Sequence, residues 1–324
     1  MPAPSPQLAL PILKTIAAPG RPGGSELSVR NEVQYVELTV RSILNWVEGT
    51  HMNEVFSVNP YRGCEFGCAY CYARYTHEFM DLPDWEAFER TIFVKTGAVR
   101  ALKRDLATSR DVRRYGIAIG TATDPYQPAE MRYRITRQIL EALLPFRDIP
   151  ISIVTKSGLI AQDAALLGRL AQRHKVRVHF SCVTTNRTLL RAIERRSPMA
   201  HVRFSALRTL TEHGVHCDVL MMPVLPGITD DEANLEAVAR EARAAGARAV
   251  HARALWLSTA SRKRFLPWLA AEFPALHDRY EAVYGERGMY TPDAYREALA
   301  ARVARILHRT GFREEASGST NMAE

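Results

Sequence analysis

Short apolar runs alternate with amphipathic stretches along most of this chain. The apolar runs lie at 55–60, 115–123, 151–156, 176–185, 217–227 and 247–257. The run at 115–123 is rich in small and β-branched residues, which is typical of a buried parallel strand. Between the runs apolar residues recur at helical spacing, for example Ile135, Ile139 and Leu143. The pattern therefore predicts six strands that alternate with helices.

Strands that alternate with helices predict βαβ units, a parallel sheet and an α/β fold. Right-handed crossovers leave two architectures, a doubly wound sheet and a barrel. In a barrel the chemistry lies at the carboxyl ends of the strands, and polar residues such as Asn59 and Lys156 occur there. The domain plan we expect is a flexible tail over 1–30, the main domain with a lead-in segment over 31–257, a helical extension over 258–313 and a disordered tail over 314–324.

The chain is basic, because it has 43 lysines and arginines but only 35 aspartates and glutamates, which gives a net charge of +8. This balance indicates either a polyanionic partner such as nucleic acid or simply an arginine-rich surface, and both interpretations stay open. No apolar run reaches roughly 18 residues, so we expect no membrane span. The N-terminus lacks the pattern of a secretory signal, so we expect a cytoplasmic protein.

Three of the five cysteines, Cys64, Cys68 and Cys71, lie within eight residues. Structural zinc usually takes four ligands as two separated pairs, whereas Cys182 and Cys217 stand alone in strand-like runs. A cubane iron–sulfur cluster usually has four thiolate ligands, so three thiolates on one loop leave one iron open to a substrate or cofactor. The spacing therefore favours an iron–sulfur cluster, and a zinc site or three unrelated buried cysteines are the alternatives.

The segment at 59–79, NPYRGCEFGCAYCYARYTHEF, resembles the motif of radical S-adenosylmethionine enzymes, in which an aromatic residue, here Tyr70, precedes the third cysteine. From about 57 to 257 the chain resembles the six-stranded partial (β/α)6 barrel of that family, a TIM-type barrel with parallel strands. A narrower likeness is to DNA repair photolyase-like proteins related to spore photoproduct lyase. It rests on NPYRGCEFGCAYCYAR, on GTATDPYQPAE at 120–130, on VTKSG at 154–158 and on FLPWLAAEFPALHDRY near the C-terminus.

The resemblance implies a [4Fe-4S] cluster on the three cysteines, with S-adenosyl-L-methionine bound at the open iron. It also implies that a reductant such as flavodoxin or ferredoxin supplies one electron, and that a 5′-deoxyadenosyl radical then takes a hydrogen atom from the substrate. The chain would thus be a lyase-like radical enzyme whose substrate the sequence does not name.

The resemblance also assigns partners to the cofactor. Lys156 would pair with its carboxylate, although a solvated lysine at a strand end is the alternative. Thr123 and Asp124 would accept hydrogen bonds from its amino group, and Ser181 would contact its ribose. Cys182, the neighbour of Ser181, should face away because successive strand side chains alternate.

Three tyrosines complete the candidate site. Tyr70 and Tyr72 would form a shelf for the adenine, or they are plain packing residues. Related lyases carry a cysteine near the end of the second strand that returns a hydrogen atom to the product, but the matching stretch GTATD has none. Repair of the spore thymine lesion by that route is therefore in doubt. Tyr126 is the candidate substitute as a catalytic residue, and capping of the barrel mouth is its alternative role.

Two short basic clusters, Arg195–Arg196 and Arg262–Arg264, would contact phosphates or form a solvated surface. Three functions stay open at this point: a radical enzyme that acts on nucleic acid such as damaged DNA, a radical enzyme that acts on a protein or small molecule, and a non-catalytic iron–sulfur sensor or zinc-binding module. A basic groove with exposed aromatic residues would favour the first, and a closed pocket would favour the second.

Overall fold

The computed structural model describes residues 26–312, apart from 31–32, 49–53, 83, 110 and 286–287. Residues 1–25 of the expected N-terminal tail and the expected tail at 314–324 lie outside the described residues. The last five residues of the expected N-terminal tail, Glu26–Arg30, form strand β1, which pairs antiparallel with β2 (Val33–Glu37). The lead-in segment therefore begins earlier than the sequence indicated.

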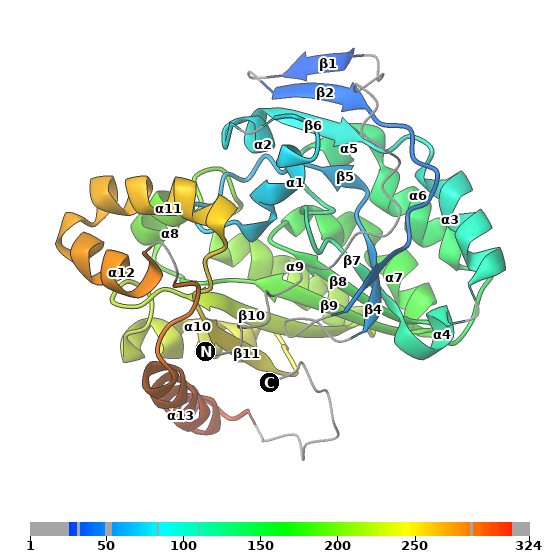
Figure 1. Cartoon of the computed structure of the whole chain (residues 1–324). Coiled ribbons are helices and arrows are strands. Elements are labelled where there is room, and N and C mark those ends of the chain that lie inside the picture. Colours follow the sequence, from blue (N-terminus) through cyan, green and yellow to red (C-terminus); the bar gives the residue numbers. More distant parts are fainter. Residues whose placement is uncertain are drawn as a thin grey trace, which may run out of the picture.

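The main sheet has seven strands in the order β11-β10-β9-β8-β7-β4-β3. Its strands are β3 (Asn45–Val47), β4 (Val55–Val58), β7 (Ile117–Ile119), β8 (Pro150–Thr155), β9 (Lys175–Ser181), β10 (His216–Val224) and β11 (Val250–Ala254). The six strands from β4 to β11 run parallel, as predicted, and β3 adds an antiparallel edge. Because β3 and β11 lie at opposite edges of the sheet, the structure is an open partial (β/α)6 barrel rather than a closed one (Figure 1).

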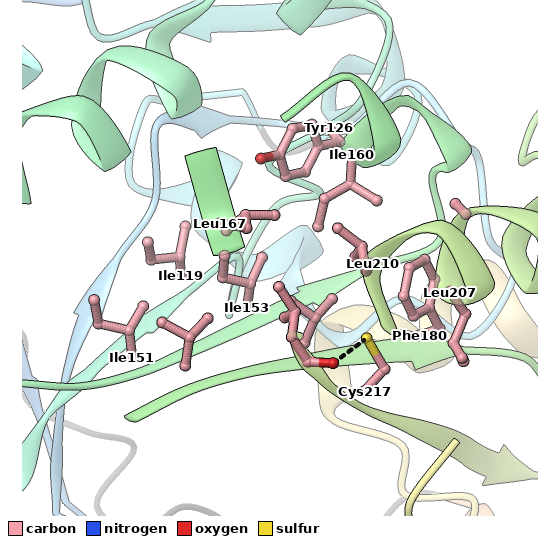
Figure 2. Packing of buried hydrophobic residues seen from close by; sticks show 14 of the residues in the cluster. Ile119, Tyr126, Ile151, Ile153, Ile160, Leu167, Phe180, Leu207, Leu210 and Cys217 are labelled. Carbon is pink, nitrogen blue, oxygen red and sulfur yellow. Dashed lines mark hydrogen bonds between the residues drawn. The ribbon is translucent and has the colours of Figure 1, made fainter. Parts of the chain in front are cut away.

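The two faces of this sheet differ in polarity. The helix-covered face carries buried apolar side chains, among them Ile119, Ile153 and Val178. Figure 2 shows side chains of this face packed against Ile160, Leu167, Leu207 and Leu210 from the helical layer. Because strand side chains alternate, the partners Val154 and His179 point to the other face, where both are half-buried. The sheet thus buries one face in the core and presents a polar row on the other.

Helices connect the strands on the covered side of the sheet. They are α3 (Ala98–Thr108), α4 (Val112–Tyr115), α5 (Ala129–Tyr133), α6 (Ile135–Leu143), α7 (Ala164–Ala171), α8 (Arg187–Ile193), α9 (Ala200–Glu212) and α10 (Glu232–Ala244), with the 3-10 turn η2 at Gly158–Asp163. The helical spacing of Ile135, Ile139 and Leu143 belongs to α6, and Arg134 with its left-handed φ of 53° separates α6 from α5. Asn186 and Asp231 cap α8 and α10, since their side chains accept backbone hydrogen bonds from Leu189 and Asn234.

A second, smaller sheet has the order β1-β2-β6-β5 and is not evident in the hydrophobic pattern. Its last two strands are β5 (Tyr61–Arg62) and β6 (Thr91–Val94), and they flank the cysteine loop in sequence. The short elements η1 (Tyr72–Arg74), α1 (Tyr75–Glu78) and α2 (Ala87–Arg90) lie between them. This sheet therefore holds both ends of the segment that contains the three cysteines.

The expected C-terminal helical extension is present as α11 (Thr259–Glu272), the 3-10 turn η3 (Pro274–Leu276), α12 (His277–Tyr284) and α13 (Asp293–Arg309). Residues of α11 and α12 share an apolar cluster with α8 and the cysteine loop, whereas α13 packs on α10 and β11 (Figure 1). Among the helices of the described residues, none is both long and apolar enough to cross a membrane.

The two-faced sheet predicts a sharp contrast between adjacent residues of β8. Ile153→Ala removes a fully buried side chain and should lower the free energy of unfolding by about 2–5 kcal/mol. Val154→Ala, on the polar face, should cost less than about 1 kcal/mol. Urea unfolding of both variants followed by circular dichroism measures the difference. Equal losses would contradict the assignment of the two faces.

Candidate functional site

The cysteine loop joins β5 to η1, and its path requires glycine. Gly63 and Gly67 have φ angles of +89° and +66°, which side-chain-bearing residues rarely adopt. A Cβ atom on Gly67 would lie 2.8 Å from Oε2 of Glu89. Inside the loop the Cys71 amide donates to the Cys68 carbonyl over 3.3 Å, which turns the chain back on itself. Local backbone geometry thus gathers the cysteines on one tight loop.

The outer side of the loop is fastened by the segment that follows α8. Arg196 donates from Nε to the Glu65 carbonyl over 2.6 Å and from its amide to the Phe66 carbonyl over 3.0 Å. The Ala69 amide donates to the Ile193 carbonyl over 3.0 Å. Residues more than 120 positions away in the sequence therefore hold the cysteine loop in place.

A buried carboxylate, Glu89, completes this attachment. Its two oxygens accept from Arg74 and Arg196, each over 2.6 Å. Arg74 also donates to the Cys68 carbonyl over 2.8 Å. The arginine on each side of Glu89 thus contacts the loop backbone, so a network of two cations and one carboxylate holds the loop.

The end of the second parallel strand holds the loop from the other side. Thr123 donates to the Gly63 carbonyl over 2.5 Å, and Gln127 donates to the same carbonyl over 3.1 Å. Asp124 accepts from the Thr155 hydroxyl and from the Lys156 amide, each over 2.7 Å. The structure therefore places Thr123 and Asp124 beside the loop, but it engages both in internal hydrogen bonds. Their predicted contact with the cofactor amino group stays a prediction.

Lys156 lies at the carboxyl end of β8 beside the loop. Its Nζ is 5.6 Å from the ring centroid of Tyr70, within the range of a cation–π contact. Burial opposes its charge, but the nearby Cys68 and Glu194 raise the pKa of Lys156 above its ordinary value. Lys156 is therefore a fixed positive charge facing the cysteines, which is the position predicted for a carboxylate partner.

Behind Tyr70 lies a fully buried ion pair. Arg203 of α9 and Glu194 approach to 2.5 Å, and Tyr70 donates its hydroxyl hydrogen to Glu194. Arg203 also donates to the Ser181 carbonyl over 2.7 Å. Burial acts to raise the pKa of Glu194, but the charges of Arg203 and Lys156 outweigh it and hold the pKa below its ordinary value. Glu194 therefore stays ionised and ties loop, strand and helix together.

Ser181, the last residue of β9, has a buried hydroxyl without a partner. The residue is 4% exposed, and its Oγ makes no hydrogen bond within the described part of the chain. A buried polar group that stays unsatisfied costs about 1–3 kcal/mol, so such a group needs a ligand or a functional reason. Cys182, by contrast, packs in the core on the helix-covered side, as strand alternation predicted. Ser181 thus fits the predicted contact with a ribose.

The three candidate tyrosines have different surroundings. Tyr70 is buried under Lys156, whereas Tyr72 is 39% exposed, with its ring 6.1 Å from that of Trp256. Tyr126 does not join this group, because its hydroxyl donates to Asp163 over 3.1 Å in the helix-side core (Figure 2). A hydrogen donor must reach the substrate, so this position does not support the catalytic role suggested for Tyr126.

The three thiols on the loop form the candidate donor set. Burial raises the pKa of all three thiols, while Lys156 acts to lower it at Cys68 and Arg74 acts to lower it at Cys71. Within the described ranges, no three His, Cys, Asp or Glu side chains are placed to hold a single ion. Each cysteine of a cubane cluster binds a different iron, so that group needs no common focus. The loop with its cationic frame fits a three-cysteine cluster.

Sequence reasoning missed the residues that position the loop. Glu194 and Arg203 lie in a segment that reads as exposed and basic, and their burial comes only from packing. A polar row on β9 and β10 was also missed, in which Nδ1 of His179 lies 3.6 Å from Oδ2 of Asp218. Its signal was present, since Arg177, His179 and Ser181 alternate with apolar residues in the fourth strand run.

Comparison with known proteins agrees with this geometry. The family model described as Radical SAM superfamily matches residues 58–239. An uncharacterized protein of Mycobacterium tuberculosis (strain ATCC 25618 / H37Rv) is 36% identical over 276 residues, which is 85% of this chain and 80% of that protein. An uncharacterized protein of Methanocaldococcus jannaschii is 28% identical over 177 residues, which is 55% of this chain and 63% of that protein. The chain therefore belongs to the radical SAM superfamily.

The fold has solved counterparts at low sequence identity. A spore photoproduct lyase variant with bound AdoMet and dinucleoside spore photoproduct aligns with a TM-score of 0.62 at 14% identity, over 86% of this chain and 79% of that one. This confirms the partial barrel. Family membership implies an enzyme that uses S-adenosylmethionine and a [4Fe-4S] cluster, which argues against a non-catalytic sensor or a zinc module.

The Glu194–Arg203 pair generates a stability prediction. Arg203→Met removes the ion-pair partner of a fully buried carboxylate, which leaves only Lys156 of the two cations that lower its pKa, and should lower the free energy of unfolding by about 3–5 kcal/mol. The double variant Glu194→Gln/Arg203→Met should recover part of that loss, because neither charge of the pair remains buried without the other. Urea unfolding of the native chain, the single variant and the double variant measures these differences. A loss below about 1 kcal/mol in the single variant would contradict the prediction.

The contribution of the Glu194–Arg203 pair to the free energy of unfolding should decrease in acid. The folded pKa of Glu194 lies below the ordinary value of 4.5, so its contribution to stability is complete above pH 4.5 and is lost as the pH falls through the folded pKa. The free energy of unfolding of the native chain should therefore fall more steeply in acid than that of Glu194→Gln/Arg203→Met. Parallel slopes for the two chains would refute this.

Proposed function

We propose that this protein reductively cleaves S-adenosylmethionine to start radical chemistry on a substrate. The observation that carries the proposal is the meeting of three elements at one place: the three-cysteine loop, the fixed cation of Lys156 and the unpartnered hydroxyl of Ser181. When bound, the cluster and cofactor supply a 5′-deoxyadenosyl radical that removes a hydrogen atom from the substrate.

The chain's own residues bind and orient the cofactor in this proposal. Lys156 pairs with its carboxylate and remains charged because Cys68 and Glu194 lie nearby. Ser181 donates its free hydroxyl to the ribose. Tyr72, which is partly exposed next to the third cysteine, offers an aromatic face to the adenine. Tyr70 acts from behind, because its hydroxyl is bound to Glu194 and its ring supports Lys156.

We propose damaged DNA as the substrate, in the lyase-like manner of DNA repair photolyase-like proteins. The support is the fold shared with a spore photoproduct lyase whose structure holds a dinucleoside spore photoproduct, together with the net charge of +8. The polar face of the sheet carries Arg177 and His179 in line with Ser181 along β9. Arg177 is exposed and charged, whereas burial lowers the pKa of His179 to about 4, so this imidazole is neutral and can only form hydrogen bonds. The stretch GTATD contains no cysteine, so hydrogen return must differ from that of the related lyases.

The proposed chemistry needs a reducing environment and an electron donor. All five cysteines are free thiols, which is the ordinary state in the cytoplasm. We therefore place the enzyme in the cytoplasm, where flavodoxin or ferredoxin would supply the electron.

Formation of 5′-deoxyadenosine tests the reaction itself. The anaerobic chain, reconstituted with iron and sulfide and reduced with dithionite, should form this nucleoside from S-adenosylmethionine, and ultraviolet-irradiated DNA should increase the amount. Cys68→Ala should form none, because one iron loses its ligand. Chromatography of the quenched mixture measures the product. An intact cluster without any 5′-deoxyadenosine, with and without damaged DNA, would sink the proposal.

The role of Ser181 gives a second test that does not depend on the substrate. Ser181→Ala should weaken cofactor binding to the reconstituted protein by about 3–10-fold, the value of one hydrogen bond. It should leave the free energy of unfolding of the cofactor-free chain unchanged or slightly higher, because the lost hydroxyl has no partner. Ser152→Ala, at the other end of the same sheet face, is the matched control. Equal affinity of the two variants in equilibrium dialysis would exclude this role.

A further inference from the structure

A basic surface lies next to the cysteine loop and takes no part in the proposed cofactor binding. We call it the basic face. Its residues come from α8, the segment after α8 and the start of α11: Arg187, Arg191, Arg195, Arg196, Arg262 and Lys263, with the buried Arg264 beneath them. The segments 187–197 and 259–264 contain a single carboxylate, Glu194, which is fully buried against Arg203. The basic face therefore presents cations without a carboxylate of its own at the surface.

Packing brings these two distant segments together. Trp268 of α11 donates from its indole nitrogen to the Ala192 carbonyl of α8 over 3.0 Å. Leu190 and Phe265 belong to the same apolar cluster, and Figure 1 shows α8 and α11 as neighbours. Burial lowers the pKa of Arg264, and the nearby positive charges of Arg74 and Arg195 add to that effect. Charges from both segments are thus concentrated on one surface.

The acidic residues next to the basic face are already paired. Glu78 lies 3.7 Å from Lys263, and Glu86 pairs with Arg90 over 3.0 Å. Glu89 is buried between Arg74 and Arg196. The neighbouring carboxylates therefore reduce the positive charge of this surface only in part.

The basic face reaches the cysteine loop through one side chain. Arg196 is 47% exposed, yet its Nε donates to the carbonyl of Glu65, the residue after Cys64. The first turn of η1, which follows Cys71, packs against α11. One arginine side chain therefore spans the distance between solvent and the loop backbone on this side. The cofactor residues Lys156 and Ser181 approach the loop from the strand ends instead.

We propose that the basic face is the docking site for a small acidic electron-carrier protein with a flavin or an iron–sulfur centre. The inference rests on the proposed function, in which each cleavage of S-adenosylmethionine consumes one electron. The reduced carrier loses one electron and the cluster on the loop gains it, and no atom or proton is transferred between the proteins. Opposite charges on the two surfaces steer the encounter and fix the orientation.

The composition of the basic face favours a protein over a nucleic acid. Single-stranded nucleic acid is bound by cations together with aromatic side chains on which bases stack. The segments 187–197 and 259–264 contain no aromatic residue, and the nearby Trp85 is stacked beneath Arg264 at 4.2 Å. A DNA substrate must also present its carbon atom to the cofactor at the strand ends. The basic face therefore suits an acidic protein surface.

The test compares two charge-reversed variants of the reconstituted chain. Arg195→Glu/Lys263→Glu changes two exposed residues of the basic face. Lys175→Glu/Arg208→Glu makes the same change in net charge at exposed positions at the start of β9 and in the second half of α9. Calorimetry measures the Kd for reduced flavodoxin and for an acidic [2Fe-2S] ferredoxin at low and high salt. We expect the first variant to bind at least about tenfold more weakly than the native chain, with a smaller salt dependence, and the control to bind normally.

A functional readout separates this inference from the proposed function. With dithionite as reductant both variants should form 5′-deoxyadenosine at the native rate, whereas with flavodoxin and its reductase the basic-face variant alone should be slow. Absence of the nucleoside with dithionite would overturn the proposed function, while the calorimetric Kd would still decide the docking site. Native-like carrier affinity in the basic-face variant, no binding of either carrier to the native chain, or loss of single-stranded DNA binding with unchanged carrier affinity would each overturn the docking proposal.

Discussion

The buried ion pair between Glu194 and Arg203 is the constraint on which the site depends. Arg203 holds the Ser181 carbonyl at the end of β9, and Glu194 accepts the hydroxyl hydrogen of Tyr70 from the cysteine loop. Removing two charges from water costs several kcal/mol per ion, so such a pair persists only when further hydrogen bonds complete it. Ser197 supplies one of these, since its hydroxyl donates to Glu194 over 2.8 Å. A single pair of charges thereby fixes a loop, a strand end and a helix relative to one another.

The charges around the loop explain how three thiols can lie together in a buried place. Burial raises the pKa of the thiols, and the positive charges of Lys156 and Arg74 act to lower it at Cys68 and Cys71, as a set of thiolates requires. Iron binds the thiolate form of cysteine, so a cluster bound on this loop would displace the thiol protons. The same cations hold the loop backbone or face the predicted cofactor carboxylate. The electrostatic frame is therefore built before any metal arrives.

In these proposals the cofactor and the electron carrier reach the cysteine loop from different sides. From the strand ends, Lys156 and Ser181 receive the cofactor, and the polar face of the sheet continues through His179 and Asp218. On the side of α8 and α11, Arg196 and its neighbours form a cationic surface, and the Arg196 side chain connects this surface to the loop backbone. The two approaches use different parts of the chain, because Lys156 and Ser181 lie at the ends of β8 and β9 whereas the basic face is built on α8 and α11. Substrate and electron can then reach the cluster without competing for one surface.

The sequence by itself indicated the family and the six parallel strands, and it pointed to Cys64, Cys68 and Cys71 as candidate cluster ligands, because strand periodicity and close cysteine spacing are local properties. It also placed Lys156 and Ser181 at strand ends and turned Cys182 toward the core. Only the tertiary structure showed that Glu194 pairs with Arg203, and that Tyr126 donates its hydroxyl hydrogen to Asp163 in the core. It also joined α8 to α11 into one basic face. These features depend on contacts between residues far apart in the chain. The sequence alone does not distinguish a charged residue that is buried in an ion pair from one that is exposed to solvent.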